Sequence, residues 1–302
     1  MIFEKFKNGD SWKMSFQQLT MLVHREETDV VEEILTLTGA VSISYLDAKD
    51  NPIYEPPLGT TPLWDDVILQ ALFEKNINFV ELNHLLEETF AHPFGFQIET
   101  VSAEDWQKRW QQEFSAKQFG RLWICPSHET VTDPNAIIVK LDPGMAFGTG
   151  SHPTTALCLQ WLADNLQSDS IVVDFGCGSG ILAIAAAKLG AKKVYAIDND
   201  PQAILATQSN ANDNDLSDTQ IICLAPENIP ASLKADVIVA NILANPLIEL
   251  APMLTGLLKP NGQLVLSGIL AEQGDSVIHA YQSFFAHFTV VQQQDWLCIA
   301  FE

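Results

Sequence analysis

The chain has 302 residues, more than the roughly 100 to 200 of a usual single domain, so we expect two domains. Its composition is 47% hydrophobic and 18% charged, and no apolar run approaches the ~20 residues of a membrane-spanning helix, which indicates a soluble protein without a membrane partner. The formal net charge of -22 argues against an exposed basic footprint for nucleic acid. It is compatible with ordinary solubility charge and equally with recognition of a basic partner.

The cysteines stand singly in apolar surroundings, without the paired spacing of metal ligands. We therefore expect reduced thiols and no metal site. The N-terminal residues lack the apolar stretch of a secretory signal, so the expected location is the cytoplasm. The cysteines are Cys125, Cys158, Cys177, Cys223 and Cys298.

Short, mixed elements occupy the chain up to about residue 101, and they predict a small α+β domain over residues 1–101. Apolar residues such as Val31 and Leu35 recur at helical spacing, and Gly39 suits the C-terminus of that helix. The order of the elements suggests a sandwich of the split β-α-β type. The expected strands cover residues 11–19, 41–47 and 94–101, and the expected helices lie around residues 30–35, 64–75 and 81–91.

A charged segment follows, with the pattern of a single helix in which Trp106 and Trp110 share one face. We predict a linker helix over residues 102–118. The alternative is that this segment is the last helix of the first domain. The second domain then covers residues 119–302.

From about residue 170 the chain alternates strand and helix, which predicts β-α-β units and a parallel sheet covered on both faces. The last two strands are too close for a crossover and must form an antiparallel hairpin. This Rossmann-like, seven-stranded α/β architecture is typical of class I methyltransferases. The expected strands cover residues 171–175, 193–198, 220–224, 235–241, 263–268, 288–294 and 296–302.

The first of these strands ends in a glycine-rich loop, DFGCGSG, that opens a helix. Gly176, Gly178 and Gly180 allow a tight turn and close approach of a cofactor. An acid precedes them, and Asp174 would repel the pyrophosphate of a dinucleotide. It can instead assist binding of an ammonium group, directly or through water, while the helix-start amides favour a carboxylate. The spacing therefore predicts S-adenosylmethionine, with Asp174 and the three glycines as cofactor-binding residues.

Asp198 ends the second strand, where a carboxylate can accept hydrogen bonds from the two hydroxyls of a ribose. We predict that it binds the cofactor ribose. Asp200 precedes Pro201 and is predicted to cap the next helix. After the third strand, residues 225–227 lie where an adenine contact is often found, although simple capping of the loop is equally compatible.

Asn241 ends the fourth strand at the edge of the sheet where ligands bind in open α/β folds. We predict that it is the catalytic residue and that it also contacts the cofactor. The alternative is that it caps the following turn.

Several segments together resemble the bacterial ribosomal protein L11 methyltransferase family: LDPGMAFGTGSHPTTALCLQWL, the glycine loop with its helix, VYAIDNDPQAI, DVIVANILANPL and LSGIL. The resemblance covers residues 100–302 well and the first 100 by pattern only. It implies trimethylation of lysine side chains and of the N-terminal α-amine on a basic protein of the large ribosomal subunit. It also implies that a ferredoxin-like N-terminal domain grips the substrate.

Carried over by motif, the resemblance places cofactor contacts on Thr155, Gly176, Asp198 and Asn241. Phe147 and Thr149, in AFGTGSH, are expected to lie over the cofactor. His152 follows them, and we favour a loop-stabilising role for it over that of a base.

Other functions remain open at this point. A methyltransferase for nucleic acid or glutamine would carry an N/D-P-P-Y/F motif, whereas this chain has N-I-L-A at residues 241–244. Another class I N-methyltransferase would act on a different protein, and a non-catalytic module would bind the cofactor without turnover. We expect a monomer.

Overall fold

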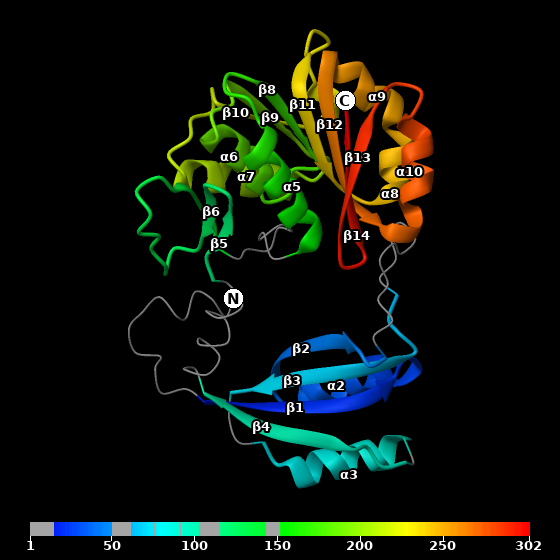
Figure 1. Ribbon diagram of the computed structural model, residues 1–302. Coiled ribbons are helices and arrows are strands. Elements are labelled where there is room, and N and C mark those ends of the chain that lie inside the picture. Colours follow the sequence, from blue (N-terminus) through cyan, green and yellow to red (C-terminus); the bar gives the residue numbers. More distant parts are fainter. Residues whose placement is uncertain (1–14, 50–61, 75–76, 91, 103–114, 143–151) are drawn as a thin grey trace. The chain divides into compact units, whose positions relative to one another are not determined.

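The computed structural model describes residues 15–49, 62–74, 77–90, 92–102, 115–142 and 152–302. The chain divides into two compact units, residues 1–113 and residues 114–302, which are drawn in Figure 1. Within the described ranges, every helix is too short or too polar to span a lipid bilayer.

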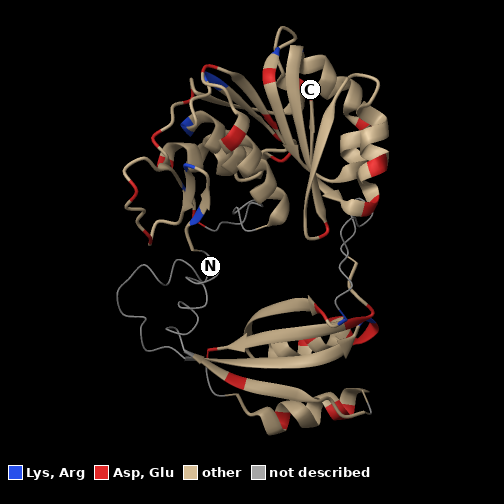
Figure 2. Ribbon diagram, viewed as in Figure 1, with Lys and Arg blue, Asp and Glu red and all other residues tan. Residues whose placement is uncertain are grey.

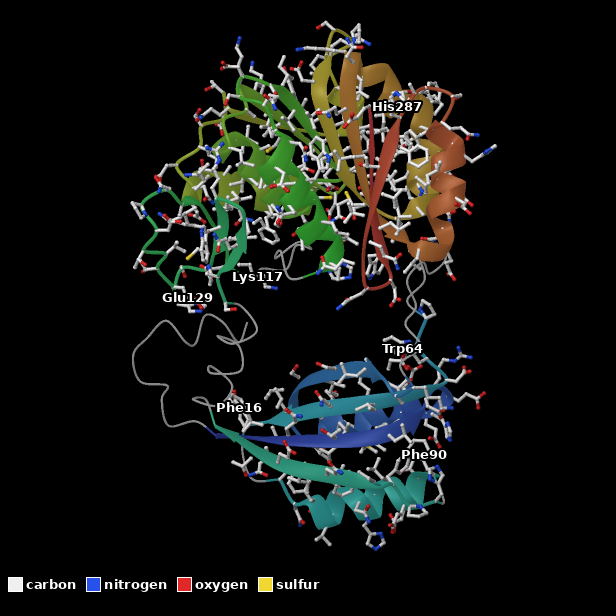
Figure 3. All side chains as sticks on the ribbon, in the orientation of Figure 1. Phe16, Trp64, Phe90, Lys117, Glu129 and His287 are labelled. Carbon is white, nitrogen blue, oxygen red and sulfur yellow. The ribbon has the colours of Figure 1, made fainter. Side chains whose placement is uncertain are left out.

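The first unit is built on a four-stranded antiparallel sheet with strand order β2-β3-β1-β4. Its elements follow one another as β-α-β-β-α-β, the ferredoxin-like arrangement, which confirms the predicted split β-α-β type. Both helices pack on one face of the sheet and share its core. Phe90, labelled in Figure 3, ends the second helix. Its ring packs edge-on against that of Phe94, with centroids 5.2 Å apart. The elements are β1 (Ser15–His24), α2 (Thr28–Leu37), β2 (Ala40–Asp47), β3 (Asp66–Phe73), α3 (Phe79–Phe90) and β4 (Phe96–Ser102).

One predicted element of this unit is wrong, because the expected helix over residues 64–75 is strand β3. Its residues alternate between half-buried and buried, and Leu69, Ala71 and Phe73 face the core. The segment DVILQALF is largely apolar on both faces, so hydrophobic periodicity does not separate a helix from a strand. Pairing with β1 on one side and β2 on the other decides for the strand.

The predicted linker helix over residues 102–118 meets the described residues only at its ends. Ser102 is the last residue of β4, and strand β5 (Lys117–Phe119) already begins at Lys117 (Figure 3). The structure therefore corrects both ends of the range. Residues 103–114, including the two tryptophans, lie outside the described residues.

A seven-stranded sheet forms the centre of the second unit, with strand order β10-β9-β8-β11-β12-β14-β13. The pairs among the first five strands are parallel, whereas β14 runs antiparallel to both β12 and β13. The predicted terminal hairpin and the Rossmann-like fold are thus confirmed. The strands are β8 (Ile171–Phe175), β9 (Lys193–Ile197), β10 (Ile221–Leu224), β11 (Ala235–Asn241), β12 (Leu258–Leu270), β13 (Phe288–Gln293) and β14 (Trp296–Phe301).

Helices cover both faces of this sheet (Figure 1). On β8, Val172 packs into the core on one face and Val173 into the core on the other. The first core holds residues of α5 (Pro153–Asn165), α6 (Ile181–Lys188) and α7 (Pro201–Asp213). The second core holds residues of α8 (Ala244–Glu249), α9 (Ala251–Leu257) and α10 (Gly274–Tyr281).

A second, three-stranded sheet in this unit was not expected from the sequence. Its order is β5-β6-β7, with β6 (Leu122–Cys125) antiparallel to β5 and parallel to β7 (Ile137–Lys140). Leu122, Ile124 and Val139 belong to the same core as α5 and α6. The small sheet therefore extends the core on the side of the main sheet that carries these helices.

Candidate functional site

A pocket of about 250 Å³ lies at the carboxyl ends of β8, β9 and β11. This is the edge at which open α/β sheets bind their ligands. Half of its lining residues were predicted as site residues from the sequence. The lining residues are Thr155, Gly176, Cys177, Gly178, Ile181, Leu182, Asp198, Asn199, Asn241 and Ile242.

The glycine loop forms one wall of this pocket. Gly176 and Gly178 have φ angles of 79° and 53°, a backbone region that residues other than glycine rarely adopt. A Cβ on Gly176 would lie 2.2 Å from Ile242 Cγ2. Glycine is therefore required here for Ile242, which also lines the pocket, to pack against the loop.

Gly180, which was also predicted to bind the cofactor, is not among the residues that line the pocket. It is the N-cap residue of α6, with a φ of 79°. A Cβ there would lie 2.7 Å from the methyl group of Thr207. Gly180 therefore serves the packing of the loop against α7.

Asp174 is buried beneath the loop, with 1% of its surface exposed, and is not among the pocket-lining residues. One carboxylate oxygen accepts from Ala183 N at 2.9 Å, and the other has no hydrogen-bond partner among the described residues. Burial raises the pKa of this carboxyl to about 7. Its contact within the protein is thus with the start of α6, and its predicted role in binding an ammonium group, directly or through water, stays a prediction.

Asp198 lines the pocket with a half-buried carboxylate. Oδ2 accepts from Gly178 N at 2.9 Å, and Oδ1 accepts from Asp200 N at 3.0 Å. A carboxylate has about four acceptor positions, so two remain for a ligand. The residue therefore holds the glycine loop as well as offering acceptors to the pocket.

The predicted capping role of Asp200 is confirmed. Its Oδ1 accepts from Gln202 N at 2.9 Å at the start of α7, and Pro201 is the first residue of that helix.

Asn241 and Thr155 both line the pocket and contact each other. Asn241 Nδ2 donates to Thr155 Oγ1 over 3.1 Å, and Thr155 itself is fully buried in the first turn of α5. This bond fixes the orientation of the amide and leaves Oδ1 of Asn241 as an acceptor.

His152 is the N-cap of α5, where its ring nitrogen Nδ1 accepts from Thr154 N at 3.4 Å. Its ring packs edge-on against Trp296, with centroids 5.0 Å apart. Burial lowers the pKa of His152, and the residue does not line the pocket. These contacts agree with a stabilising role, as favoured from the sequence.

Three other predictions remain outside the site as described. Phe147 and Thr149 lie outside the described residues. Residues 225–227 precede and begin a short 3-10 turn, Pro226–Asn228, and are not among the pocket-lining residues.

Within the described part of the chain, no group of three or more His, Cys, Asp or Glu side chains is placed to hold a metal ion.

Sequence reasoning missed Ile242, which packs between Gly176 of the glycine loop and Gly268 of β12. Its side chain covers Gly176, and its carbonyl oxygen would lie 2.2 Å from a Cβ on Gly268. Gly268 has a φ of 83° and stands in the LSGIL segment, so the available signal was a glycine inside a strand pattern. Ile181 and Leu182 were also missed, although they directly follow the glycine loop.

The family model of the ribosomal protein L11 methyltransferases (PrmA) matches residues 15–302. Relatives described as ribosomal protein L11 methyltransferase from Shewanella sp. (strain ANA-3) and Haemophilus influenzae (strain PittEE) are 48% identical over 286 residues, 94% of this chain and 97% of theirs. The solved structure of a ribosomal protein L11 methylase from Lactobacillus delbrueckii subsp. bulgaricus matches with a TM-score of 0.57 at 33% identity, over 63% of this chain and 98% of that one. By sequence over nearly the whole length and by fold, the chain belongs to the ribosomal protein L11 methyltransferase family and is a methyltransferase.

Proposed function

We propose that this chain transfers methyl groups from S-adenosylmethionine to amino groups of ribosomal protein L11, both lysine side chains and the N-terminal α-amine. Each amine is taken to the trimethylated state. The observation that carries the choice of an amine is the position of Asn241, which lines the pocket and whose amide is held by Thr155.

The residues of the pocket fit S-adenosylmethionine. Gly176 and Gly178 present bare backbone to the pocket, and Asp198 keeps acceptor positions for two ribose hydroxyls. Ile181 and Leu182 add apolar wall. When bound, S-adenosylmethionine supplies a methyl group on a sulfonium, which is already a good leaving group, so the protein mainly positions and desolvates the reactants.

Asn241 suits the task of orienting an amine. Because Nδ2 donates to Thr155 Oγ1, Oδ1 is left to accept an N–H of the incoming amine. An acceptor at this point binds a hydrogen of the amine and leaves its lone pair for the methyl group. A donor there would engage the lone pair instead.

The amine must lose its proton before transfer. For a lysine of pKa about 10.4 this costs about 5 kcal/mol at pH 7, whereas an α-amine of pKa about 8 needs about 1 kcal/mol. Among the residues that line the pocket, the titratable side chains are Asp198 and Cys177. Burial raises the pKa of the Cys177 thiol far above its ordinary value, so the thiol stays protonated. Asp198 is held by backbone amides, and the proton therefore leaves to water.

The charge of the chain favours a basic substrate. The net charge is -22, and acidic side chains are spread over both units (Figure 2). Such a surface attracts a basic protein and repels phosphate. A ribosomal substrate also places the reaction in the cytoplasm.

The test is incubation of the purified chain with S-adenosylmethionine and purified L11, followed by intact mass spectrometry. We expect successive mass increments of one methyl group, and none on L11 whose amines were first acetylated. Asn241→Ala should slow the transfer, whereas Asn212→Ala, a change at an exposed asparagine of α7, should not. An unchanged mass of L11 would contradict the proposal that L11 is the substrate. Methylation of acetylated L11 would contradict the proposal that the acceptor is an amine.

A further inference from the structure

One face of helix α7 carries a row of three polar side chains, two of them buried and one partly exposed. Thr207, Asn210 and Asn214 follow one another at helical spacing, the last of them at the C-cap position. Thr207 is 0% and Asn214 1% exposed. Buried polar groups require partners, and those of this row are backbone groups of the glycine loop and of the small sheet.

Thr207 contacts the loop with both branches of its side chain. Its hydroxyl donates to the loop, within hydrogen-bonding distance of Gly178 O at 3.1 Å and of Cys177 Sγ at 3.3 Å. Its methyl group lies 2.7 Å from the position of a Cβ on Gly180. The residue therefore fixes one carbonyl of the loop and fills the space that a glycine leaves.

Asn210 holds the next carbonyl of the loop. Its Nδ2 donates to Ser179 O over 2.8 Å. Two consecutive carbonyls, those of Gly178 and Ser179, are thus bonded to α7, while Gly178 N is bonded to Asp198 on the pocket side. Neither Thr207 nor Asn210 lines the pocket.

Asn214 fixes the helix that carries these two residues. Its side-chain amide forms two hydrogen bonds of 2.7 Å with the backbone of Lys140, one accepted from N and one donated to O. It also donates to Asn210 O over 2.8 Å. Strand β7 pairs with β6, and Asn214 occupies backbone groups at the end of that strand.

We propose that Thr207 and Asn210 are positioning residues for the cofactor: they hold the glycine loop in its binding conformation before the cofactor arrives. This inference rests on the proposed use of S-adenosylmethionine. A loop with three glycines has many conformations open to it, and ordering it on binding would cost affinity. Hydrogen bonds that fix its carbonyls in advance remove that cost.

The test compares variants that separate the hydroxyl of Thr207 from its shape. Thr207→Val keeps the shape and loses the donor, whereas Thr207→Ser keeps the donor. Asn210→Ala loses the second donor, and Asn212→Ala is the matched control on the same helix. The dissociation constant of S-adenosylhomocysteine is measured by calorimetry, well below the melting temperature of every variant, and kcat is measured at saturating S-adenosylmethionine.

We expect Thr207→Val and Asn210→Ala to weaken binding about tenfold each, with Thr207→Ser and Asn212→Ala close to the wild type. The value of kcat should change little, because neither side chain touches the acceptor amine. If Thr207→Val does not fold, the dissociation constant of Asn210→Ala still tests the proposal, because Asn210 is partly exposed and its replacement disturbs the core less.

Lower melting temperatures with wild-type dissociation constants would show that the row is only structural and would overturn the proposal. If the wild-type protein does not bind S-adenosylhomocysteine, the proposed use of S-adenosylmethionine is contradicted instead. The two failures are therefore distinguishable.

Discussion

Replacing Asp174 by asparagine should change how the stability of the second unit depends on pH. The carboxyl is 1% exposed, and one of its oxygens has no hydrogen-bond partner among the described residues. Burial raises its pKa to about 7, whereas an unfolded chain titrates an aspartate at about 3.9. The folded protein therefore binds this proton more tightly than the unfolded chain does.

The sign and the size of the effect follow from this difference. Because the folded pKa lies above the unfolded one, the contribution to stability is full below about pH 4 and is lost as the pH rises towards 7. A shift of about three units corresponds to an upper bound of about 4 kcal/mol. Of this, about 2 kcal/mol is lost between about pH 5.5 and pH 8. Asparagine does not titrate, so Asp174→Asn escapes this loss.

The assay is urea unfolding of wild type and Asp174→Asn at the two pH values, followed by circular dichroism. The variant places an amide NH2 where a carboxylate oxygen lies, at a cost that does not depend on pH and cancels in the comparison. We expect the free energy of unfolding of the variant, relative to wild type, to rise by about 2 kcal/mol from pH 5.5 to pH 8. An equal difference at both pH values would refute the reasoning.

Asp236→Asn is the matched control for this experiment. Burial alone would raise the pKa of Asp236, but hydrogen bonds from Lys259 and from Ile171 N lower it. Its stabilising effect is therefore present above the unfolded pKa and is lost only as the pH falls through the lower folded value. The relative stability of Asp236→Asn should be the same at pH 5.5 and pH 8.

Three further substitutions test the packing and the hydrogen bonds of the site. Gly268→Ala would place a Cβ 2.2 Å from Ile242 O at a φ of 83°. It should lower the free energy of unfolding in urea by about 2 to 5 kcal/mol. Wild-type stability would contradict this expectation and would mean that the backbone at Ile242 can shift at little cost. Thr155→Val removes the acceptor of Asn241 Nδ2 and should lower kcat about tenfold, while Thr155→Ser should retain activity; equal rates for both would contradict the role of this bond. Asp200→Ala removes a helix cap and should cost about 1 kcal/mol of stability without changing the affinity for S-adenosylhomocysteine, so a large loss of affinity would show that Asp200 acts on the site.

Local patterns predicted much of the second unit. Strand and helix alternate there with clear signals at their boundaries, such as the cap of Asp200 followed by Pro201, which depends on atoms only two residues apart. Asp198 and Asn241 were predicted as pocket residues because the carboxyl ends of parallel strands meet at one edge of a sheet. A rule of topology therefore placed them without any knowledge of side-chain packing.

The sequence was ambiguous where both faces of an element are apolar. The periodicity of strand β3 fits a helix as well as a strand, and only its pairing with two other strands decides for the strand. The short strands of the small sheet were missed for a related reason. They are three or four residues long, too short to show a periodic pattern.

The sequence by itself determined the Rossmann-like fold, the glycine loop and the family resemblance, because these depend on periodicity and on spacings within a few residues. Only the tertiary structure decided which atoms face the pocket. It buried Asp174 beneath the loop, placed Ile242 between Gly176 and Gly268, and brought Asn210 to the carbonyl of Ser179 across 31 positions of sequence. Burial and hydrogen-bond partners of this kind arise when distant segments pack together, and no local pattern encodes them.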